Sequence, residues 1–508
     1  MTNQVVLVLD FGGQYKESVA RRVRELKVYS IIKPYNISVD EIKKINPIGI
    51  ILTGGEESVN DTESPRCDKE IFNLGIPVMG ICYGMLVMAN MLGGKVESIN
   101  KEYGKVEAKV CKNAKLFDGV KENTMVMMNH TEKLVTLPSG FTSVASTSVT
   151  EFAAIENADK NLYGLQFRPE VDLTEEGKTV FKNFVFGVCG AKGDYAMKDF
   201  IEQQKQLIKE QVGNERVILG LSGGVDSSVC AALLEYAIPN QAVCIFVDHG
   251  CMRKNEGDQI EAAFKDKNVT FVRVNAQQRF LSKLKGVTDP EQKRKIIGKE
   301  FIEVFQDEAK KYGDAKFLAQ GTIYPDIVES GWVGKKAVVK SHHNVGGLPK
   351  DMNFTGLVEP LKSLFKDEVR ELGRLLGLPK ELVNRQPFPG PGLAVRVLGE
   401  VNEPKLNIVR EADAIFREEL ERSGEKADQY FAILTSVQSV GVRNEERTYD
   451  YTIALRAVKT NDFMTCEYVP LSHDLLGKVS ARIVNEVEGV NRVVYDITGK
   501  PPATIEWE

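Results

Sequence analysis

A cysteine flanked by two glycines is the first candidate nucleophile that a sequence motif marks. The segment Gly80-Ile-Cys82-Tyr-Gly84 follows the apolar run Ile76–Ile81 and precedes a helical pattern that begins near Met85. Glycines permit a sharp strand-to-helix turn, and a nucleophile on such a turn is presented to substrate. The helix N-terminus beside the sulfur is expected to lower the thiol pKa and favour the thiolate. A core cysteine between two glycines is the alternative interpretation.

Backbone amides for an oxyanion hole are predicted on a second turn. Thr53-Gly54-Gly55 follows the apolar run Ile48–Leu52, and its N–H groups could stabilise charge on a substrate oxygen beside Cys82. An ordinary turn at a strand end would give the same pattern. A cysteine hydrolase also needs a base, usually histidine, and His130 is the only histidine before residue 249.

These residues resemble the class I glutamine amidotransferases, which release ammonia from glutamine with a Cys-His-Glu triad. The resemblance implies that Cys82 is the nucleophile and that Glu170, in Gln166-Phe-Arg168-Pro-Glu170, is the acidic member of the catalytic set. The family has histidine where this chain has Arg168. Arginine stays protonated in proteins and cannot exchange a proton as a general acid or base. The resemblance therefore implies an amidotransferase fold whose glutaminase activity is weak or lost.

Three further departures from the amidotransferase pattern lie close to these motifs. The family's Gly-Gly-Pro turn ends in Glu56 here, and the glutamine usual after Cys-Tyr-Gly-Met is Leu86. The family's Ser-His-Gly-Asp segment reads Asn129-His130-Thr131-Glu132. These substitutions are expected to change the glutamine pocket further.

A second strand-to-helix turn has the composition of a phosphate-binding loop. Leu221-Ser-Gly-Gly-Val-Asp-Ser-Ser228 follows the strand pattern Val217–Leu221 and opens a helical pattern that continues to about Tyr236. Glycines let the backbone approach an anion, and the helix N-terminus attracts it. No Gly-Lys-Ser/Thr follows, so the loop is not a Walker A loop. A purely structural turn is the alternative.

The same string resembles the PP-loop of ATP pyrophosphatases, which cleave ATP between the α and β phosphates. The resemblance implies that ATP is the cofactor and that the loop supplies its contacts: Ser222, Gly223, Gly224, Val225, Asp226, Ser227 and Ser228. Asp226 could also hold Mg²⁺. Gly321-Thr-Ile-Tyr-Pro-Asp326-Ile-Val-Glu329-Ser330 places two more carboxylates three residues apart, which suits Mg²⁺ or an adenylate.

Further polar loops follow the phosphate loop in sequence. Arg253 and Lys254 follow the strand end Val247-Asp248-His249-Gly250, where α/β proteins place ligand loops. The segment from Lys340 through His342 and His343 is rich in charge and glycine, as a lid over polyphosphate would be. Taken singly, each is equally consistent with a solvated loop.

Three longer strings resemble the GMP synthetases along essentially the whole chain. They are Lys340-Ser-His-His-Asn-Val-Gly-Gly-Leu-Pro349, Arg385-Gln-Pro-Phe-Pro-Gly-Pro-Gly-Leu393 and Lys500-Pro-Pro-Ala-Thr-Ile-Glu-Trp-Glu508. This resemblance implies that ATP adenylates the C2 oxygen of xanthosine 5′-monophosphate (XMP) and that ammonia then displaces AMP to give GMP. It also implies a homodimer formed by a small third domain. The substrate contacts expected are Arg253, Lys340, His342, His343, Lys500 and Glu506.

Three functions are left open by the sequence. The first is an XMP aminase with a weak or dead glutaminase half, for which free ammonia is the effective donor. The second is a paralogue that acts on a modified purine nucleotide or uses another nitrogen donor. The third is non-enzymatic for the N-terminal part, which would serve as a ligand-sensing or docking module.

The elements that must position these sites alternate between strand and helix. Val5–Leu9, Ile48–Leu52 and Ile76–Ile81 are continuous apolar runs, typical of strands buried on both faces of a parallel sheet, with a helix predicted over Tyr15–Leu26. A charged helical stretch, Asp194–Glu210, leads into a second series. The strands predicted there are Val217–Leu221, Ala242–Asp248 and Phe271–Val274.

The texture of the sequence changes after a rigid loop, Pro387–Gly392. Beyond it, helices mix with the strand-like runs Tyr449–Val458 and Asn491–Ile497. We therefore predict an α/β protein with two parallel-sheet domains, an amidotransferase-like one at 1–190 and a PP-loop pyrophosphatase at 191–385. A small α+β dimerisation and XMP-binding domain is predicted at 386–508.

Composition indicates an ordinary globular protein of several domains. The chain has 508 residues, 43% of them hydrophobic and 27% charged, which favours about three globular domains. A net charge of −5 gives no basic excess of the kind that nucleic-acid binders show. Apolar runs fall short of the ~20 residues that a membrane helix needs.

Two features predict a cytoplasmic protein. The eight cysteines show no Cys-x-x-Cys pair, which favours reduced thiols over disulfides or a zinc site. The stretch Met1-Thr-Asn-Gln runs directly into the strand pattern Val5–Leu9 and leaves no room for a signal peptide.

Overall fold

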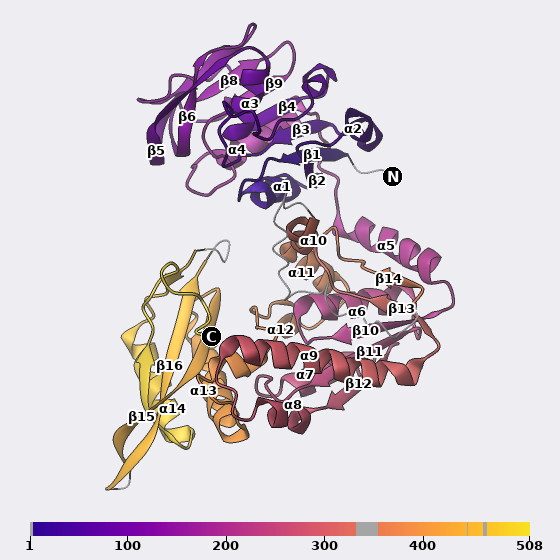
Figure 1. The fold of residues 1–508 in the computed structure, drawn as a ribbon, viewed down its shortest axis with the longest axis vertical. Helices are drawn as coiled ribbons and strands as arrows, with labels where there is room; N and C mark the ends of the chain where they lie inside the picture. Colours follow the sequence, from indigo (N-terminus) through magenta and orange to yellow (C-terminus); the bar gives the residue numbers. More distant parts are fainter. Residues whose placement is uncertain (1–3, 332–353, 444, 461–464) are drawn as a thin grey trace. The chain divides into compact units, whose positions relative to one another are not determined.

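The structure is a computed structural model and describes residues 4–331, 354–443, 445–460 and 465–508. Two compact units divide the chain. The first comprises residues up to 199 together with 325–331, and the second comprises 200–324 and the described residues from 354 onward. Figure 1 traces the chain through both units by colour. No helix in these ranges is long and apolar enough to span a membrane.

A nine-stranded sheet organises the first unit, in the order β2-β1-β3-β4-β9-β8-β7-β5-β6. Its first five strands run parallel, and four of them are buried along nearly their whole length, as continuous apolar runs predict. These strands are β1 (Val5–Asp10), β2 (Tyr29–Pro34), β3 (Gly49–Leu52), β4 (Val78–Ile81) and β9 (Leu162–Leu165). The helices of the unit include α1 (Lys16–Glu25), α2 (Val39–Ile45), α3 (Tyr83–Met91) and α4 (Gly177–Lys182).

The other side of this sheet is antiparallel, which the sequence analysis did not predict. Its strands are β5 (Lys95–Val110), β6 (Asn123–Thr136), β7 (Thr142–Ser146) and β8 (Ala154–Asn157). In β6 buried and more exposed residues alternate over much of the strand, because one face meets water. The sequence pattern gave no sign of these four strands, because their apolar residues are too dispersed to form continuous runs.

A parallel five-stranded sheet organises the second unit, in the order β12-β11-β10-β13-β14. Its strands are β10 (Arg216–Leu221), β11 (Ala242–Asp248), β12 (Thr270–Asn275), β13 (Ala315–Ala319) and β14 (Gly356–Val358). The helices are α5 (Met197–Val212), α6 (Val225–Ala237), α7 (Glu256–Phe264), α8 (Gln277–Leu284), α9 (Pro290–Ala309), α10 (Tyr324–Gly331), α11 (Lys366–Leu375) and α12 (Lys380–Val383). The first residue of α10, Tyr324, belongs to the second unit, and the rest of the helix belongs to the first.

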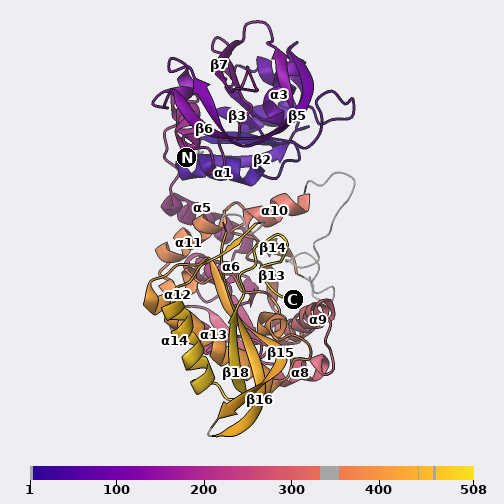
Figure 2. The ribbon, with the colours of Figure 1, turned by 90° about the vertical axis from the view of Figure 1, so that its left-hand side faces the viewer.

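The second unit continues into a smaller sheet. Its strands β15 (Gln429–Arg443), β16 (Glu446–Lys459) and β17 (Glu467–Tyr468) are antiparallel, while β18 (Val490–Tyr495) pairs with β16 in parallel. Two helices, α13 (Glu403–Ser423) and α14 (His473–Glu486), accompany this sheet, and Figure 2 shows α14 alongside β18.

One hydrophobic core joins the two sheets of the second unit. It runs from Ile218 on β10 and Val243 on β11 to Phe416 on α13 and Leu455 on β16, all of them essentially inaccessible to solvent. The predicted fold class, two α/β parts followed by a small α+β part, is confirmed. The predicted domain boundaries at 190 and 385 stay predictions.

Candidate active sites

The turn that carries Cys82 is a strained strand-to-helix elbow. Cys82 lies between β4 and α3 with φ 51° and ψ −110°, a backbone conformation that non-glycine residues rarely adopt. A Cβ on Gly80 would lie 2.6 Å from the carbonyl oxygen of Gly84, and one on Gly84 would lie 2.4 Å from that of Leu52. Both glycines are thus required by close backbone contacts, which fits the nucleophile-elbow interpretation.

The electrostatics at Cys82 oppose the predicted thiolate. Burial raises the pKa of the Cys82 thiol, and it outweighs the Arg168 guanidinium, which lowers that pKa. The Glu170 carboxylate raises the pKa as well, while the hydrogen bond from the backbone of Tyr83 lowers it. The backbone at the helix N-terminus does lower the thiol pKa, but desolvation of the buried sulfur is the larger effect, so the expected net lowering of that pKa was wrong.

Arg168 and Glu170 are buried next to each other. The Arg168 Nη1 donates to Glu170 Oε1 at 3.4 Å, a long hydrogen bond, and both side chains are at most 10% exposed. Arg168 Nε and Glu170 Oε2 find no hydrogen-bond partner among the described residues. Burial raises the pKa of Glu170, although Arg168 lowers it. The pair is therefore enclosed but incompletely satisfied.

A pocket of about 280 Å³ opens beside the elbow. Cys82 and Arg168 line it, and so does Gly55 of the predicted oxyanion turn. The departures from the amidotransferase pattern also lie here: Glu56, Leu86 and the segment from Asn129 to Glu132. The structure thus brings together the residues that the sequence singled out in the first unit.

His130 lines the same pocket, but its two ring nitrogens are already engaged. Nδ1 faces the backbone carbonyl of Glu132 at 2.8 Å, and Nε2 faces Glu102 Oε2 at 2.8 Å. A carbonyl oxygen only accepts, so Nδ1 is the donor in the first contact, and Nε2 faces a carboxylate oxygen in the second. The ring is held as a structural donor and has no free nitrogen to serve Cys82 as a base.

The phosphate-like loop connects β10 to α6 at the carboxyl end of a central strand. Gly223 has φ +80°, and a Cβ there would lie 2.6 Å from Ile260 Cδ1 of α7. Ser222 Oγ accepts from the N–H of Gly224 at 3.3 Å and lies 3.0 Å from Ser227 Oγ. The hydroxyls of Ser227 and Ser228 donate to the Gly224 carbonyl at 3.2 and 2.8 Å. The loop and its hydroxyls therefore form one hydrogen-bonded unit at the N-terminus of α6.

Lys366, which no sequence motif indicated, contacts this loop. Its Nζ, at the start of α11, donates to both carboxylate oxygens of Asp226 at 2.7 and 2.8 Å. A lysine beside a phosphate loop supplies the positive charge that a Walker A lysine supplies elsewhere. No local spacing could reveal it, because 140 residues separate the two partners.

Arg253 lies in a buried charged cluster between the two sheets of the second unit. Its Nε lies 3.9 Å from Asp413 Oδ2, and its guanidinium lies 4.1 Å from the ring centre of Phe388. Burial lowers the pKa of Arg253 to about 10, opposed by Asp413. Nε and Nη1 of Arg253 and Nη1 of Arg396 have no hydrogen-bond partner within the described ranges. Such donors suit an anionic ligand.

Three family models match the chain in order. They are glutamine amidotransferase class-I at residues 7–188, NAD synthase at 196–292 and the GMP synthase C terminal domain at 418–507. The glutamine-hydrolyzing GMP synthase of Acetivibrio thermocellus is 57% identical over all of both chains. That of Treponema denticola is 58% identical over 99% of this chain and 97% of its own.

The chain belongs to the glutamine-hydrolysing GMP synthases. The predicted family and the predicted ligase class are thereby confirmed. Among solved structures, a glutamine amidotransferase of Thermotoga maritima is 20% identical, with a TM-score of 0.28. The match covers 42% of this chain and 86% of that protein.

In this family member, the segment 500–508 is packed against the second unit. Glu506 accepts from Arg396 through both carboxylate oxygens, at 3.1 and 2.8 Å. Glu508 pairs with Lys293, a lysine with no exposed surface. Ion pairs thus anchor this segment. The predicted roles of Lys500 and Glu506 toward the nucleotide stay predictions.

The predicted Mg²⁺ ligands, Asp226, Asp326 and Glu329, stay predictions. No group of three histidine, cysteine, aspartate or glutamate side chains suited to a metal occurs there. Asp226 belongs to the second unit, whereas Asp326 falls in the part of α10 that belongs to the first. The side chain of Glu329 lies outside the described part of the chain. Lys340, His342 and His343 also lie outside it.

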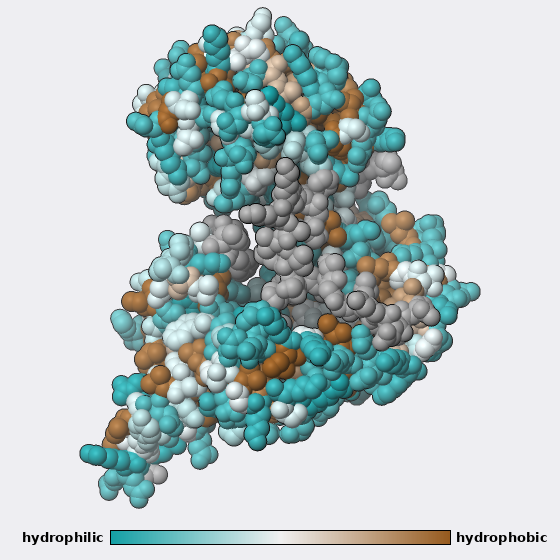
Figure 3. Space-filling model, in the orientation of Figure 1, coloured by the Kyte–Doolittle hydropathy of each residue, from teal (hydrophilic) through white to brown (hydrophobic). Residues whose placement is uncertain are grey.

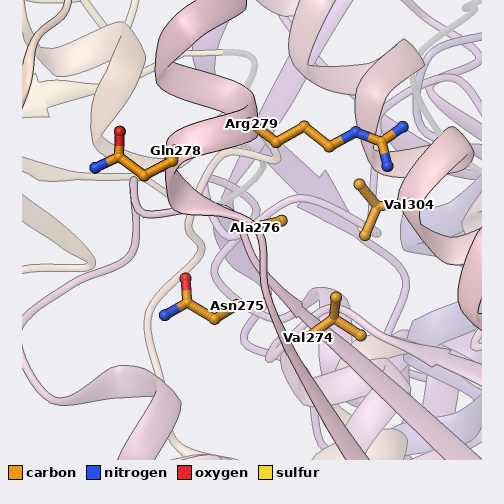
Figure 4. A pocket seen from close by; sticks show the side chains of 6 residues that line it. All are labelled: Val274, Asn275, Ala276, Gln278, Arg279 and Val304. Carbon is orange, nitrogen blue, oxygen red and sulfur yellow. The ribbon is translucent and has the colours of Figure 1, made fainter.

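A larger cavity of about 570 Å³ lies at the end of β12, and none of the predicted site residues that the structure describes lines it (Figure 4). Arg279 extends along it toward Val304. The Arg279 guanidinium is already paired with Glu300, Glu303 and Asp307. This cavity follows the edge strand of the sheet, whereas the phosphate-like loop follows the central strand β10, so we do not assign the chemistry to it.

Proposed function

We propose that this GMP synthase aminates XMP with ammonia taken from solution, and that its glutaminase half is weak or inactive. The single observation that carries the proposal is Arg168, which occupies the position of the family's catalytic histidine and contacts Glu170. The engaged ring of His130 supports it, because no other described histidine lines the pocket.

The synthetase half would work in two steps. The C2 oxygen of XMP attacks the α-phosphorus of ATP, a C2–O–P bond forms, and the bond to the β-phosphate breaks to release pyrophosphate. Ammonia then attacks C2, the C2–O bond breaks so that AMP leaves with the original oxygen, and the new nitrogen loses a proton to solvent, which gives GMP. The amides of the Ser222–Ser228 loop and Lys366 would hold the departing pyrophosphate. Arg253, Lys500 and Glu506 would contact the nucleotide.

Mg²⁺ would reach this site with ATP. Magnesium is commonly held by one or two carboxylates together with substrate phosphates, and Asp226, with its carboxylate at the loop and 30% exposed, suits that role. When bound, the ion would neutralise charge on the phosphates. Lys366 now occupies both Asp226 oxygens and would share or release them.

The amidotransferase half lacks a route for the protons of amide hydrolysis. The thiol must lose a proton to attack the amide, and the leaving nitrogen must gain one. The raised pKa of Cys82 makes the first step harder, and Arg168 cannot perform either transfer. Losing a general acid–base costs about 10²–10⁴-fold in rate.

The decisive experiment measures GMP formation from XMP and ATP with glutamine and ammonium supplied separately. Ammonium should support synthesis, and glutamine should support it about 10²–10⁴-fold less well. Efficient glutamine-driven turnover that Cys82→Ala abolishes would refute the proposal and would direct attention to Glu170 or a water as the base. Failure of XMP to support ATP–pyrophosphate exchange would instead favour a modified purine nucleotide as acceptor.

A ligand-sensing role for the first unit is the second candidate. The pocket beside Cys82 is open, with a volume of about 280 Å³, so a small amino acid could bind there without being hydrolysed. Calorimetric titration of glutamine into the protein tests this role. Binding without release of ammonia would support it, and the absence of any binding heat would argue against it.

We also propose that the chain is a cytoplasmic homodimer that associates through its smaller sheet. Large apolar side chains are exposed there: Val437, Val440, Val442, Tyr449, Val494 and Ile497. Figure 3 shows apolar residues among hydrophilic ones over β15 and β16. Exposed apolar patches of this kind mark protein interfaces. Light scattering should give twice the chain mass, and Val440→Glu should shift it toward the monomer.

A further inference from the structure

Arg385 connects the ATP loop to a neighbouring helix. It follows α12, and its Nη1 donates to the carbonyl oxygen of Gly223 at 2.8 Å and to Glu256 Oε1 at 2.7 Å. Its Nη2 donates to Gln259 Oε1 at 3.2 Å. The Arg385 side chain is 9% exposed and that of Glu256 only 3%. A buried guanidinium with three separate acceptors is held in one orientation by its planar geometry.

The peptide unit that Arg385 contacts is the most easily reoriented one in the loop. It joins Gly223 to Gly224, so no Cβ on either side opposes a rotation of the plane. The carbonyl oxygen of this plane faces Arg385, while its N–H donates to Ser222 Oγ at 3.3 Å. A flipped plane would aim the carbonyl oxygen toward the side of the Ser222 and Ser227 hydroxyls, where it would repel a phosphate.

The carboxylate that holds Arg385 also holds the loop of Arg253. Glu256 Oε2 accepts from the backbone N–H of Arg253 at 3.0 Å, while its other oxygen binds Arg385. Glu256 begins α7, and Ile260 of the same helix packs beneath Gly223. One buried ion pair thus fixes the backbone at the phosphate loop and at the predicted nucleotide contact together.

We propose that Arg385 is a positioning residue that locks the Gly223–Gly224 peptide with its N–H on the phosphate side of the loop. The proposal rests on the assignment of this loop as the ATP site. Arg385 touches neither substrate nor reacting atoms in this role. It acts by satisfying the Gly223 carbonyl, which would otherwise be free to turn inward.

The test is the affinity of the full-length protein for inorganic pyrophosphate, measured by calorimetry, together with the steady-state kinetics of ATP. Arg385→Met should weaken pyrophosphate binding about tenfold, equivalent to roughly 1.4 kcal/mol, as expected for loss of a charge-assisted hydrogen bond. The half-saturating ATP concentration should rise by a similar factor, with kcat at saturating ATP changed less. Arg385→Lys, which keeps one cationic donor, should recover part of the affinity and serves as the test variant if Arg385→Met fails to fold.

Arg273→Met is the matched control. Arg273 pairs with Asp258 and Glu261 on the same helix α7 and with Asp248, and its ion pairs do not include the phosphate loop. Pyrophosphate affinity should be unchanged in this variant. Equal losses in Arg273→Met and Arg385→Met would show that loosening of α7 is the cause, and wild-type affinity in Arg385→Met would also overturn the proposal. A wild-type protein that binds no pyrophosphate would instead overturn the assignment of the ATP site.

Discussion

Two strand-to-helix turns of this chain hold the candidate active sites, and they differ in how well the polar groups around them are satisfied. At the Cys82 elbow the sulfur is enclosed, its thiol pKa is raised, and the neighbouring Arg168 and Glu170 leave polar atoms without partners. At the Ser222–Ser228 loop the hydroxyls bond to the loop itself, and Asp226 has a lysine partner.

The difference shows that the backbone of such a turn can be held independently of the side chains that line its pocket. The glycines of the elbow are fixed by contacts with the carbonyls of Gly84 and Leu52, although Arg168 stands where we expect the family's catalytic histidine. A strained turn is stable because surrounding packing holds it, whatever side chain faces the pocket. Activity in the first unit therefore has to be judged from Arg168 and its neighbours, and not from the turn.

The largest effect is expected on repairing the elbow's pocket. Arg168→His alone should recover less than tenfold in glutamine-driven GMP synthesis, because Leu86 and Glu56 still alter the same pocket. Adding Leu86→Gln and Glu56→Pro should raise glutamine-driven synthesis by about 10²-fold or more, within the range that a general acid–base supplies. Assays with glutamine and with ammonium measure both steps. Full recovery by Arg168→His alone would show that the pocket itself was intact.

The next effect is expected at the ATP loop. Asp226→Ala, Ser227→Ala and Lys366→Met should each lower XMP-dependent AMP release by about 10²–10³-fold, the usual loss when a preorganised charge-stabilising group is removed. Lys362→Met, which removes an exposed lysine from the preceding turn, is the control. AMP release that survives the three changes would mean that ATP binds elsewhere.

A smaller difference is expected between the effects of alanine substitutions at the glycines of the two turns. Gly84→Ala forces a Cβ to within 2.4 Å of a backbone oxygen, whereas Gly224→Ala meets only Ser222 Oγ at 3.3 Å with φ −74°. Overpacking against backbone costs about 1–3 kcal/mol. Hydrogen exchange should therefore quicken in β4 and α3 of the first variant, and remain near wild type in β10 and α6 of the second. Equal exchange in both variants would contradict the close packing of the elbow.

The smallest effect concerns the protonation of Cys82. The thiolate is the form that alkylates, and a thiol whose pKa is raised is protonated near pH 7, so labelling by iodoacetamide should be slow there. The rate should climb about tenfold per pH unit as the thiolate fraction grows. Arg168→Met should slow labelling further, because the guanidinium lowers the pKa of Cys82. Peptide mass spectrometry with the exposed Cys111 as internal reference measures this. A rapid labelling rate that does not change between pH 7 and 9 would show that Cys82 is a thiolate. The difference between the two turns would then not extend to the protonation of this sulfur.

Local patterns in the sequence predicted both turns and the strands that lead into them. The runs Ile76–Ile81 and Val217–Leu221 match the bounds of β4 and β10 to within two residues. Short parallel strands that are buried on both faces consist of continuous apolar segments, which makes them easy to recognise. The antiparallel strands β5–β8 were missed, since their alternating and partly polar residues do not form such runs.

Long-range partners could not be predicted from spacing. Lys366 reaches Asp226 across 140 residues, and Arg385 reaches Gly223 across 162. The same limitation applies to His130, whose ring is held by Glu102 through a register that only the folded hairpin defines. The depressed thiol pKa expected at Cys82 failed for a related reason, because burial depends on the packing of the whole unit.

Lys293 has a consequence for anyone who wishes to dissect the protein into fragments. This buried lysine donates to the carbonyls of Ala394 and Val397 and pairs with Glu508. All three partners follow residue 385, near which the α/β pattern of the sequence gives way to a mixture of helices and strand-like runs. A fragment cut there would keep the lysine among apolar residues and lose all three of these partners, at a cost of several kcal/mol. The ATP-binding half should therefore be expressed with the smaller sheet attached, and a recombinant piece that stops near 385 should be recovered as aggregate.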